Sequence, residues 1–219
     1  MSFIADNAVN LPFGTTDFID TKSKEDLVVN GNSENNIIET GKGDDKISGG
    51  GGDDEISGGG GSDELQGGQG NDTLFGGSGN DIVSGGGGDD VISGGTGEEV
   101  LKGGSGDDFL NSGKGDDRLK GGKGNDSLDG KADSDRLTGG EGSDSFILSK
   151  GDDVITDFNF KDGDKIIINV DEKSSPKNQF KFDEIKGNLV IKYSGGSTTL
   201  LGVTLDDFNG FDPSPIEFI

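Results

Sequence analysis

The chain has 219 residues, of which 44 are glycine, and only 27% are hydrophobic. This composition makes a conventional two-layer core difficult to build and favours a repeat architecture. Asp and Glu outnumber Lys and Arg by 43 to 19, which excludes nucleic-acid partners and favours cations as ligands. The chain has no Cys or His, which excludes disulfides, thiolate or imidazole metal sites and Ser-His-Asp triads.

Residues 1–30 contain short apolar stretches, VNLPFG and LVVN, which predict one or two strands in an N-terminal cap segment. The first residues lack the basic segment and unbroken apolar run of a secretory signal peptide. No run of 18 apolar residues predicts a transmembrane segment. We therefore expect export to require another signal, and we expect no separate effector domain in this segment.

Residues 31–156 divide into fourteen consecutive blocks of nine residues without insertion or deletion. The pattern that the blocks share is Gly-Gly-x-Gly-x-Asp-x-U-x, in which U is apolar. We number the positions as slots 1 to 9 and the blocks as repeats 1 to 14. Slot 6 is Asp in twelve repeats, with Asn36 and Glu99 as exceptions, and slot 8 is apolar in all fourteen. This fixed register does not follow from glycine-rich composition alone.

The glycines at slots 1, 2 and 4 allow positive φ angles, so slots 1 to 6 predict a loop and slots 7 to 9 a short strand. The slot 8 side chain would point inward and its two neighbours outward. Two repeats would complete one coil of 18 residues and stack successive strands about 4.8 Å apart. The predicted fold class is all-β, a parallel β-roll formed by two sheets of a β-solenoid.

Stacked slot 6 carboxylates need a cation between them. Calcium accepts about 6 to 8 hard oxygen ligands and combines carboxylates with backbone carbonyls, whereas magnesium prefers a tighter octahedron. Six gaps on each side of the roll predict up to about twelve calcium ions. Weaker sites are expected at the first loop, which contains Ser33-Glu34 and Asn36, at Glu99 and at residues 130–135. The predicted carboxylate ligands are Asp45, Asp54, Asp63, Asp72, Asp81, Asp90, Asp108, Asp117, Asp126, Asp135, Asp144 and Asp153. The predicted glycine positions of the sites are Gly50, Gly52, Gly59, Gly61, Gly68, Gly70, Gly77, Gly79, Gly86, Gly88, Gly104 and Gly106.

Two other interpretations of the acidic residues are less consistent with the repeat. A solvated acidic surface needs no nine-residue period. A glycosidase needs one asymmetric pair of carboxylates rather than twelve equivalent ones. We therefore expect that the chain is not an enzyme.

After Thr156 the glycine repeat ends, and aromatic and β-branched residues become frequent. Asp162-Gly163-Asp164 predicts a turn before a strand, and NLVIKYSGGSTTLLGV predicts a hairpin that turns at Ser194–Ser197. A solenoid must cover its last apolar rung. Residues 157–219 are therefore expected to form a β-rich C-terminal cap.

The repeats resemble those of the repeats-in-toxin (RTX) family, a known calcium-binding β-roll signature. The C-terminal segment is similar to the cap of RTX proteins exported by type I secretion systems. The chain also ends in Ile216-Glu217-Phe218-Ile219, an acidic residue followed by hydrophobic ones. The resemblance implies a secreted, extracellular or cell-surface protein that folds on calcium outside the cell, with the type I secretion machinery as a partner and a secretion signal in residues 157–219.

Three functions remain open. The leading hypothesis is a secreted, calcium-folded binding or surface protein without catalysis. The second is an export or targeting module that binds an anionic polysaccharide. The third is ice binding, which requires a regular array, and the irregular slot 3 residues argue against it.

The outward residues suggest a site for the second hypothesis. Even-numbered repeats predict one sheet and odd-numbered repeats the other. Slots 7 and 9 of repeats 8, 10 and 12 contain four cations, whereas the odd face has no Lys or Arg at these slots and carries Glu55 and Asp129 instead. These cations either offset the acidic chain or bind carboxylates or sulfates of an extracellular polysaccharide. They are Lys102, Arg118, Lys120 and Arg136.

Overall fold

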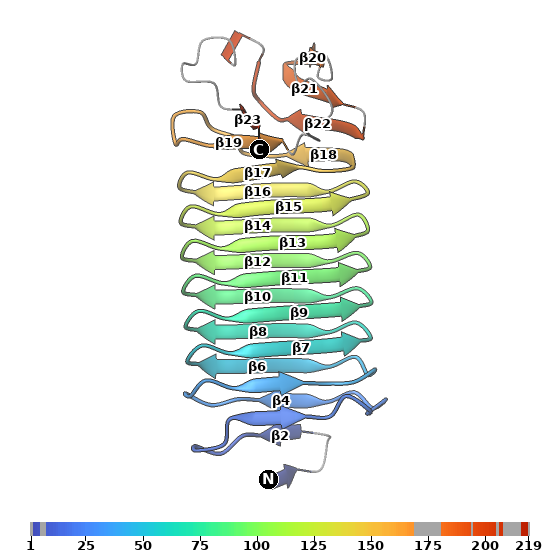
Figure 1. Ribbon diagram of the computed structural model, residues 1–219, viewed down its shortest axis with the longest axis vertical. Helices are drawn as coiled ribbons and strands as arrows, with labels where there is room; N and C mark the ends of the chain where they lie inside the picture. The colour runs from blue at the N-terminus through green and yellow to red at the C-terminus, as the bar shows by residue number, and fades with distance from the viewer. Residues whose placement is uncertain are drawn as a thin grey trace.

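The computed structural model describes residues 2–4, 8–168, 181–193, 195–204, 206–207 and 216–218. In these residues the chain winds into a long, narrow roll of two facing sheets, with β1 at one end and β20–β22 at the other (Figure 1). The first sheet, called the even sheet, contains the strands that begin in even-numbered repeats. The second, called the odd sheet, contains those that begin in odd-numbered repeats.

In spatial order, the even sheet contains β1 (Ser2–Ile4), β2 (Ala8–Asn10), β4 (Val28–Asn30), β6 (Lys46–Gly51), β8 (Glu64–Gln69), β10 (Ile82–Gly87), β12 (Val100–Ser105), β14 (Arg118–Lys123), β16 (Arg136–Glu141), β18 (Gly151–Ile155), β22 (Gly196–Leu200), β21 (Asn188–Tyr193) and β20 (Lys181–Ile185). The odd sheet contains β23 (Ile216–Phe218), β19 (Lys165–Ile168), β17 (Ser145–Leu148), β15 (Ser127–Ala132), β13 (Phe109–Lys114), β11 (Val91–Thr96), β9 (Thr73–Ser78), β7 (Glu55–Gly60), β5 (Ile37–Glu39) and β3 (Asp17–Ile19).

The strands of the repeats pair in parallel, with partners 18 residues apart. Ile47 of β6 lies beside Leu65 of β8, and Leu65 lies beside Val83 of β10. The predicted parallel β-roll, with even and odd repeats in separate sheets, is therefore confirmed.

The predicted division of each repeat into a six-residue loop and a three-residue strand is wrong. The strands from β6 to β16 are six residues long and cover slots 7 to 9 of one repeat and slots 1 to 3 of the next. Glycine allows this because Gly50 pairs with Gly68 at φ angles of 113° and 126°, which side chains with a Cβ avoid. Only slots 4 to 6 are left to form the turn.

The core contains more than the predicted apolar slot 8. Side chains of slot 8, such as Leu74 and Ile92, are fully buried and stack along the roll. Slot 6 also points inward, and its Asp side chains are between 0% and 4% exposed. Slot 1 glycines such as Gly49 are buried between them. The apolar ladder is therefore flanked by buried carboxylates, which need compensation because burying a charge is costly.

The stacking continues on both sides of the repeats. Four strands, β1 to β4, precede repeat 1, where one or two were predicted. After the repeats, β19 pairs in parallel with β17, and β22 pairs in parallel with β18. The predicted hairpin is confirmed by the antiparallel pairing of β21 with β22, although Ser194 lies outside the described residues. Among the described residues, no helix has the length and hydrophobicity needed to cross a membrane.

Candidate functional site

The slot 6 side chains form two rows at the two loop ends of the roll. The even row consists of Asp45, Asp63, Asp81, Glu99, Asp117, Asp135 and Asp153. The odd row consists of Asn36, Asp54, Asp72, Asp90, Asp108, Asp126 and Asp144. All of the predicted carboxylate ligands are buried, and neighbours within a row are 18 residues apart.

One oxygen of each carboxylate is held by the backbone. The Asp45 N–H donates to Asp63 Oδ1 at 2.8 Å, and the Asp54 N–H donates to Asp72 Oδ1 at the same distance. The second oxygen is buried without a hydrogen-bond partner. This applies to Oδ2 of Asp45, Asp54, Asp63, Asp72, Asp81, Asp90, Asp108, Asp117, Asp126 and Asp135. Such orphaned anionic oxygens are costly unless something else compensates them.

The glycines at slots 1, 2 and 4 lie so close to neighbouring oxygen atoms that a side chain would not fit there. A Cβ at Gly67 would lie 2.2 Å from Asp72 Oδ2. A Cβ at Gly68 would lie 2.1 Å from the carbonyl oxygen of Gly50, and one at Gly70 would lie 2.2 Å from that of Gly52. At these turns, backbone carbonyls of slots 2 and 4 therefore lie against the same slots of the next turn, while the carboxylate lies against slot 1 of its own repeat.

This donor set fits calcium. It consists of hard oxygens and mixes carboxylates with carbonyls, as calcium sites do. Among the residues that the structure describes, no three Asp or Glu side chains form a metal-binding cluster. A cation in these gaps would therefore need backbone carbonyls in addition to the carboxylates.

Without a cation, ionisation of these buried carboxylates is unfavourable. Burial raises the pKa of Asp63 to about 7, and repulsion from Asp81 and Asp45 adds to the rise, while the hydrogen bond from the Asp45 backbone opposes it. Burial likewise raises the pKa of Asp108 to about 7 and that of Asp54 to about 6. At neutral pH, each row is therefore a stack of repelling groups poorly solvated by water.

Comparison with family models identifies the repeat. A model described as the RTX calcium-binding nonapeptide repeat matches four times, at residues 30–65, 57–92, 93–128 and 120–155, which together span more than half of the chain. The chain belongs to this RTX family. Its nonapeptide repeats bind calcium, and proteins that carry them are typically exported by type I secretion systems.

Other comparisons add little to this RTX assignment. No curated protein sequence matches the chain. Among solved structures, the extracellular lipase LipA from Serratia marcescens is similar, with a TM-score of 0.31 and 19% identity. The match covers 89% of this chain and 40% of the lipase, so the RTX chain spans less than half of the length of that protein.

Glu99 departs from the hydrogen-bond pattern of the other slot 6 carboxylates in the even row. In the described part of the chain, no hydrogen bond joins the Asp81 N–H to Glu99, and both carboxyl oxygens of Glu99 are buried without a partner. Burial raises the Glu99 pKa to about 8, and repulsion from Asp117 contributes next. The extra methylene therefore carries the Glu99 carboxylate past the position that Asp occupies elsewhere in the row.

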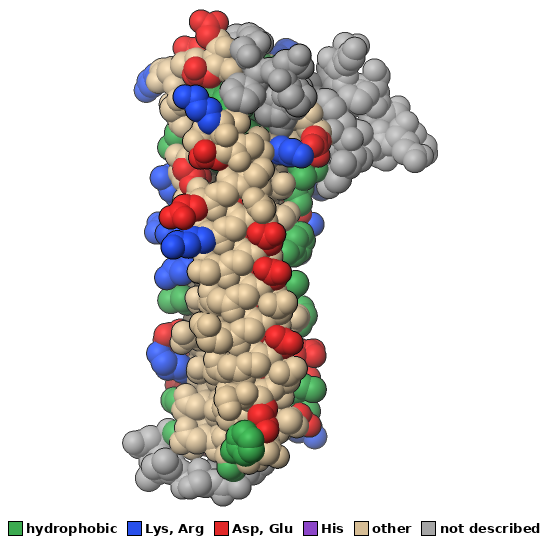
Figure 2. Space-filling model, turned by 90° about the vertical axis from the view of Figure 1, so that its left-hand side faces the viewer, with side chains coloured by type: hydrophobic (Ala, Val, Ile, Leu, Met, Phe, Trp, Pro, Cys, Tyr) green, Lys and Arg blue, Asp and Glu red, His purple; other side chains and the backbone are tan. Residues whose placement is uncertain are grey.

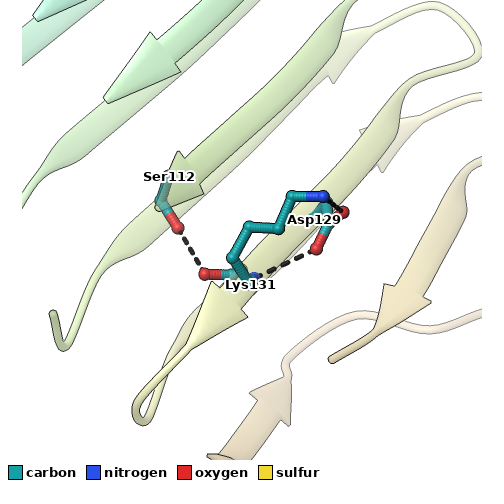
Figure 3. Close-up of polar contacts among 4 residues, drawn as sticks. Ser112, Asp129 and Lys131 are labelled. Carbon is teal, nitrogen blue, oxygen red and sulfur yellow. Dashed lines mark hydrogen bonds and ion pairs between the residues drawn. The ribbon is translucent and has the colours of Figure 1, made fainter. Parts of the chain in front are cut away.

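Repeat 12 is a second irregularity of the even row. Lys131 and Asp133 replace the glycines of slots 2 and 4 and still adopt positive φ angles of 67° and 76°. Lys131 also contacts Asp129 twice, through its backbone N–H and through Nζ at 2.7 Å (Figure 3). Asp129 was expected as an outward acid of the odd face, but its side chain is only 5% exposed because this lysine pairs with it.

Asp164 continues the odd row, although it was not predicted from the sequence. The Asp144 N–H donates to Asp164 Oδ1 at 3.0 Å, although the spacing is 20 residues rather than 18. A signal was present, because Asp164 precedes Lys165-Ile166 as slot 6 precedes slots 7 and 8. The longer turn before it concealed the match.

The sequence analysis also missed a second ladder at slot 5. The Asn71 N–H donates to Asp53 Oδ1, and the Asp89 N–H donates to Asn71 Oδ1. Slot 5 is Asp, Asn or Ser in most repeats, and these residues readily hydrogen-bond to nearby backbone. That restricted composition was the available signal.

The predicted polyanion residues do lie together. Strand register places Arg118 beside Arg136, and Lys102 beside Lys120, on the outer face of the even sheet. Lys123 lies on the same strand as Lys120 but was missed, because slot 3 was expected to be in a loop. Figure 2 shows Lys and Arg side chains gathered along one long edge of the roll and hydrophobic side chains along the opposite edge.

Proposed function

We propose that this RTX protein folds outside the cell on binding several calcium ions and then acts as a non-catalytic binding or surface protein. The observation that carries the proposal is the series of buried Oδ2 atoms without a hydrogen-bond partner, which recurs every nine residues. Calcium would coordinate these atoms and offset both the cost of burying them and the repulsion between neighbouring carboxylates.

The proposed ligands are the twelve slot 6 Asp carboxylates, together with carbonyls of the slot 2 and slot 4 glycines. Six gaps between successive loops in each row give up to about twelve ions. Asp164 would add a carboxylate at the end of the odd row, because it continues the hydrogen-bonded series. Affinity is expected in the extracellular range of about 10⁻⁴ to 10⁻³ M, which would leave the chain unfolded in the cytosol.

The proposed division of the chain follows from this role. Residues 31–156 would form the calcium-binding roll, residues 1–30 an N-terminal cap and residues 157–219 a C-terminal cap with the type I secretion signal. The pairing of β4 with β6 and of β22 with β18 supports caps that continue the roll at both ends. Family membership supports secretion by a type I system.

The ligand assignment can be tested with two matched double variants. Asp72→Asn with Asp90→Asn removes two buried slot 6 charges, whereas Asp53→Asn with Asp89→Asn removes two slot 5 charges at positions where Asn occurs naturally in other repeats. The first variant should raise the calcium concentration for half-maximal folding by about tenfold or more, and the second should leave it nearly unchanged. Equal shifts in both variants would contradict the ligand assignment.

A second candidate, a targeting module for an anionic polysaccharide, is favoured by the cations on the outer face of the even sheet.

A further inference from the structure

Five exposed cations lie on three adjacent strands of the even sheet. β12 carries Lys102, β14 carries Arg118, Lys120 and Lys123, and β16 carries Arg136. We call these five residues the cation grid. Arg118 and Arg136 are directly opposite each other, and so are Lys102 and Lys120. Like charges directly opposite on neighbouring strands destabilise a sheet, so this arrangement has a cost to the fold.

The cation grid has no internal counter-charge. Within the described residues, none of its five members forms an ion pair with Asp or Glu, although Glu141 lies opposite Lys123. Cations elsewhere do pair, as Lys46 of the same sheet does with Glu64 at 2.7 Å. Asp and Glu outnumber Lys and Arg by more than two to one in this chain, so the grid cations do not lack ion-pair partners because acidic residues are scarce. The grid is therefore not explained as a local balance of surface charge.

Two shallow hollows flank the central lysines of the grid. One, of about 460 Å³, is lined by Arg118, Arg136 and Thr138 as well as by Lys102 and Lys120. The other, of about 480 Å³, has the backbone of slot 2 glycines on successive strands and the Ser105 residue among its lining. Cations, a hydroxyl-bearing side chain and flat glycine backbone therefore lie within one continuous area.

We propose that the cation grid binds a linear anionic polysaccharide through carboxylate or sulfate groups. The proposal rests on the calcium-dependent fold, because the grid exists only when β12, β14 and β16 are paired. Rows of cations about 4.8 Å apart across the strands, and about 6.7 Å apart along them, can meet successive charges of one extended chain. Arginine adds paired donors for planar carboxylates, and neighbouring hydroxyl and backbone groups can bind sugar hydroxyls.

Other polyanions fit this face less well. The grid is three strands wide and is bordered by exposed slot 5 acids, Asp107 at one loop end and Asp116 at the other, which repel a broad polyanion such as a nucleic-acid duplex. The large hydrophobic residues exposed in the described part of the chain include none on β12, β14 or β16, so a membrane surface would find no apolar anchor there. A narrow, hydroxyl-rich chain meets neither obstacle.

The test compares binding of the full chain with that of two quadruple variants in calcium buffer. Lys102→Gln, Arg118→Gln, Lys120→Gln and Arg136→Gln remove four of the five charges of the grid. Lys22→Gln, Lys24→Gln, Lys42→Gln and Lys114→Gln remove the same charge from exposed lysines outside it. The probes for biolayer interferometry are short alginate oligomers that do not gel, dextran sulfate, neutral dextran and phosphatidylglycerol vesicles.

The grid variant should bind alginate oligomers or dextran sulfate about tenfold or more weakly than the wild type, while the control variant binds like the wild type. Alginate and dextran sulfate distinguish carboxylate from sulfate recognition. Wild-type binding should weaken strongly between about 0.05 M and about 0.5 M NaCl, and neutral dextran should not bind.

The polysaccharide proposal would be overturned by equal losses in both variants, by undiminished binding of the grid variant, by binding to vesicles alone or by absence of wild-type binding to both anionic glycans. Circular dichroism of the same samples distinguishes failure of the grid proposal from failure of the proposed function. A chain that folds in calcium but binds no glycan contradicts the grid proposal alone, whereas a chain whose folding ignores calcium contradicts the proposed function.

Discussion

The two rows of loops have the same repeat but differ at one turn. In the odd row, each slot 6 N–H from Asn36 to Asp144 donates to the carboxylate of the next turn, at 2.7 to 3.0 Å. In the even row, the same series runs from Leu27 to Asp135 but is interrupted between Asp81 and Glu99. One added methylene is therefore enough to break a ladder that otherwise continues through the whole row.

The hydrogen-bond series is interrupted because the longer Glu99 side chain places its carboxylate differently from an Asp. A Cβ at Gly67 or Gly103 would lie 2.2 Å from an Asp Oδ2, whereas one at Gly94 would lie 2.9 Å from Glu99 Cγ and farther from its oxygens. Carbon thus occupies part of the space that a ligand oxygen occupies in the other repeats. We expect the gaps beside Glu99 to be the weakest calcium sites of the even row.

The largest loss of stability is expected from substituting a slot 2 glycine in a repeat that contributes to the odd row. Gly86 has a φ of 126°, and a Cβ there would lie 2.2 Å from the carbonyl oxygen of Gly68. Gly86→Ala should lower the free energy of unfolding in calcium by about 3 kcal/mol or more, since it combines backbone strain with a clash. Urea denaturation in calcium measures the loss.

Gly87→Ala is the matched control for this prediction. Slot 3 accepts Ser78 and Thr96 in neighbouring repeats, and the nearest atoms to a Cβ at Gly87 belong to the flexible Gln69 side chain. The control should cost well under 1 kcal/mol, at about the level of a surface substitution. Similar losses in both variants would refute the special role of slot 2.

A smaller effect is expected from copying the even-row interruption into the odd row. Asp90→Glu should remove the hydrogen bond from the Asp72 N–H and lower the free energy of unfolding by about 1.5 to 3 kcal/mol, with a higher calcium midpoint. Asp17→Glu, at an exposed position on β3, adds the same methylene outside the rows. If Asp90→Glu behaves like Asp17→Glu, the carboxylate position is not decisive.

The reverse change should repair the even row. Glu99→Asp is expected to restore the hydrogen bond from the Asp81 N–H, to increase the free energy of unfolding by about 1 kcal/mol and to lower the calcium midpoint for folding. A calcium titration followed by circular dichroism measures the midpoint. An unchanged or higher midpoint would mean that the Glu99 gap already binds calcium as well as its neighbours do.

Individual carboxylates of the two rows should also differ modestly in their response to pH when calcium is absent. The pKa values of folded Glu99 and Asp135 in the even row are raised to about 8, mainly by burial, while those of Asp54 and Asp90 in the odd row are raised to about 6. A raised pKa in the folded state contributes stability that is complete below the unfolded pKa and is lost as pH rises through the folded pKa.

Metal-free protein should therefore gain β structure as pH falls from about 8 to about 5, with Glu99 and Asp135 protonated first. Circular dichroism of desalted protein across this range measures the gain. A β signal that stays flat or decreases over the same range would contradict the raised pKa values.

The periodic part of this architecture was predictable from sequence because each feature depends on one slot. An Asp at slot 6 and an apolar residue at slot 8 indicate the loop ends and the core, and the nine-residue period indicates two sheets. The extension of strands through Gly49 and Gly50 was not predictable from propensity, because glycine normally weakens strands. Here close packing against Asp54 and the neighbouring turn requires glycine, so tertiary contacts override that preference.

Features that depart from the regular repeat were harder to predict. Asp129 is buried and pairs with Lys131, whose positive φ is not indicated by sequence spacing. Asp164 joins the odd row through a coil of 20 residues, two more than the 18 of two repeats. The absence of ion pairs at the cation grid depends on the side-chain positions across three strands, although the grouping of four of its residues was evident from slots 7 and 9.

In the proposed function, calcium drives folding by occupying the gaps between buried carboxylates. The most direct test of this role is far-UV circular dichroism of the full chain at neutral pH, first in excess chelator and then during a calcium titration. We predict a disordered spectrum in chelator and a cooperative change to β structure at about 10⁻⁴ to 10⁻³ M calcium, without an equivalent effect of magnesium. A compact β spectrum that persists in excess chelator would contradict the account.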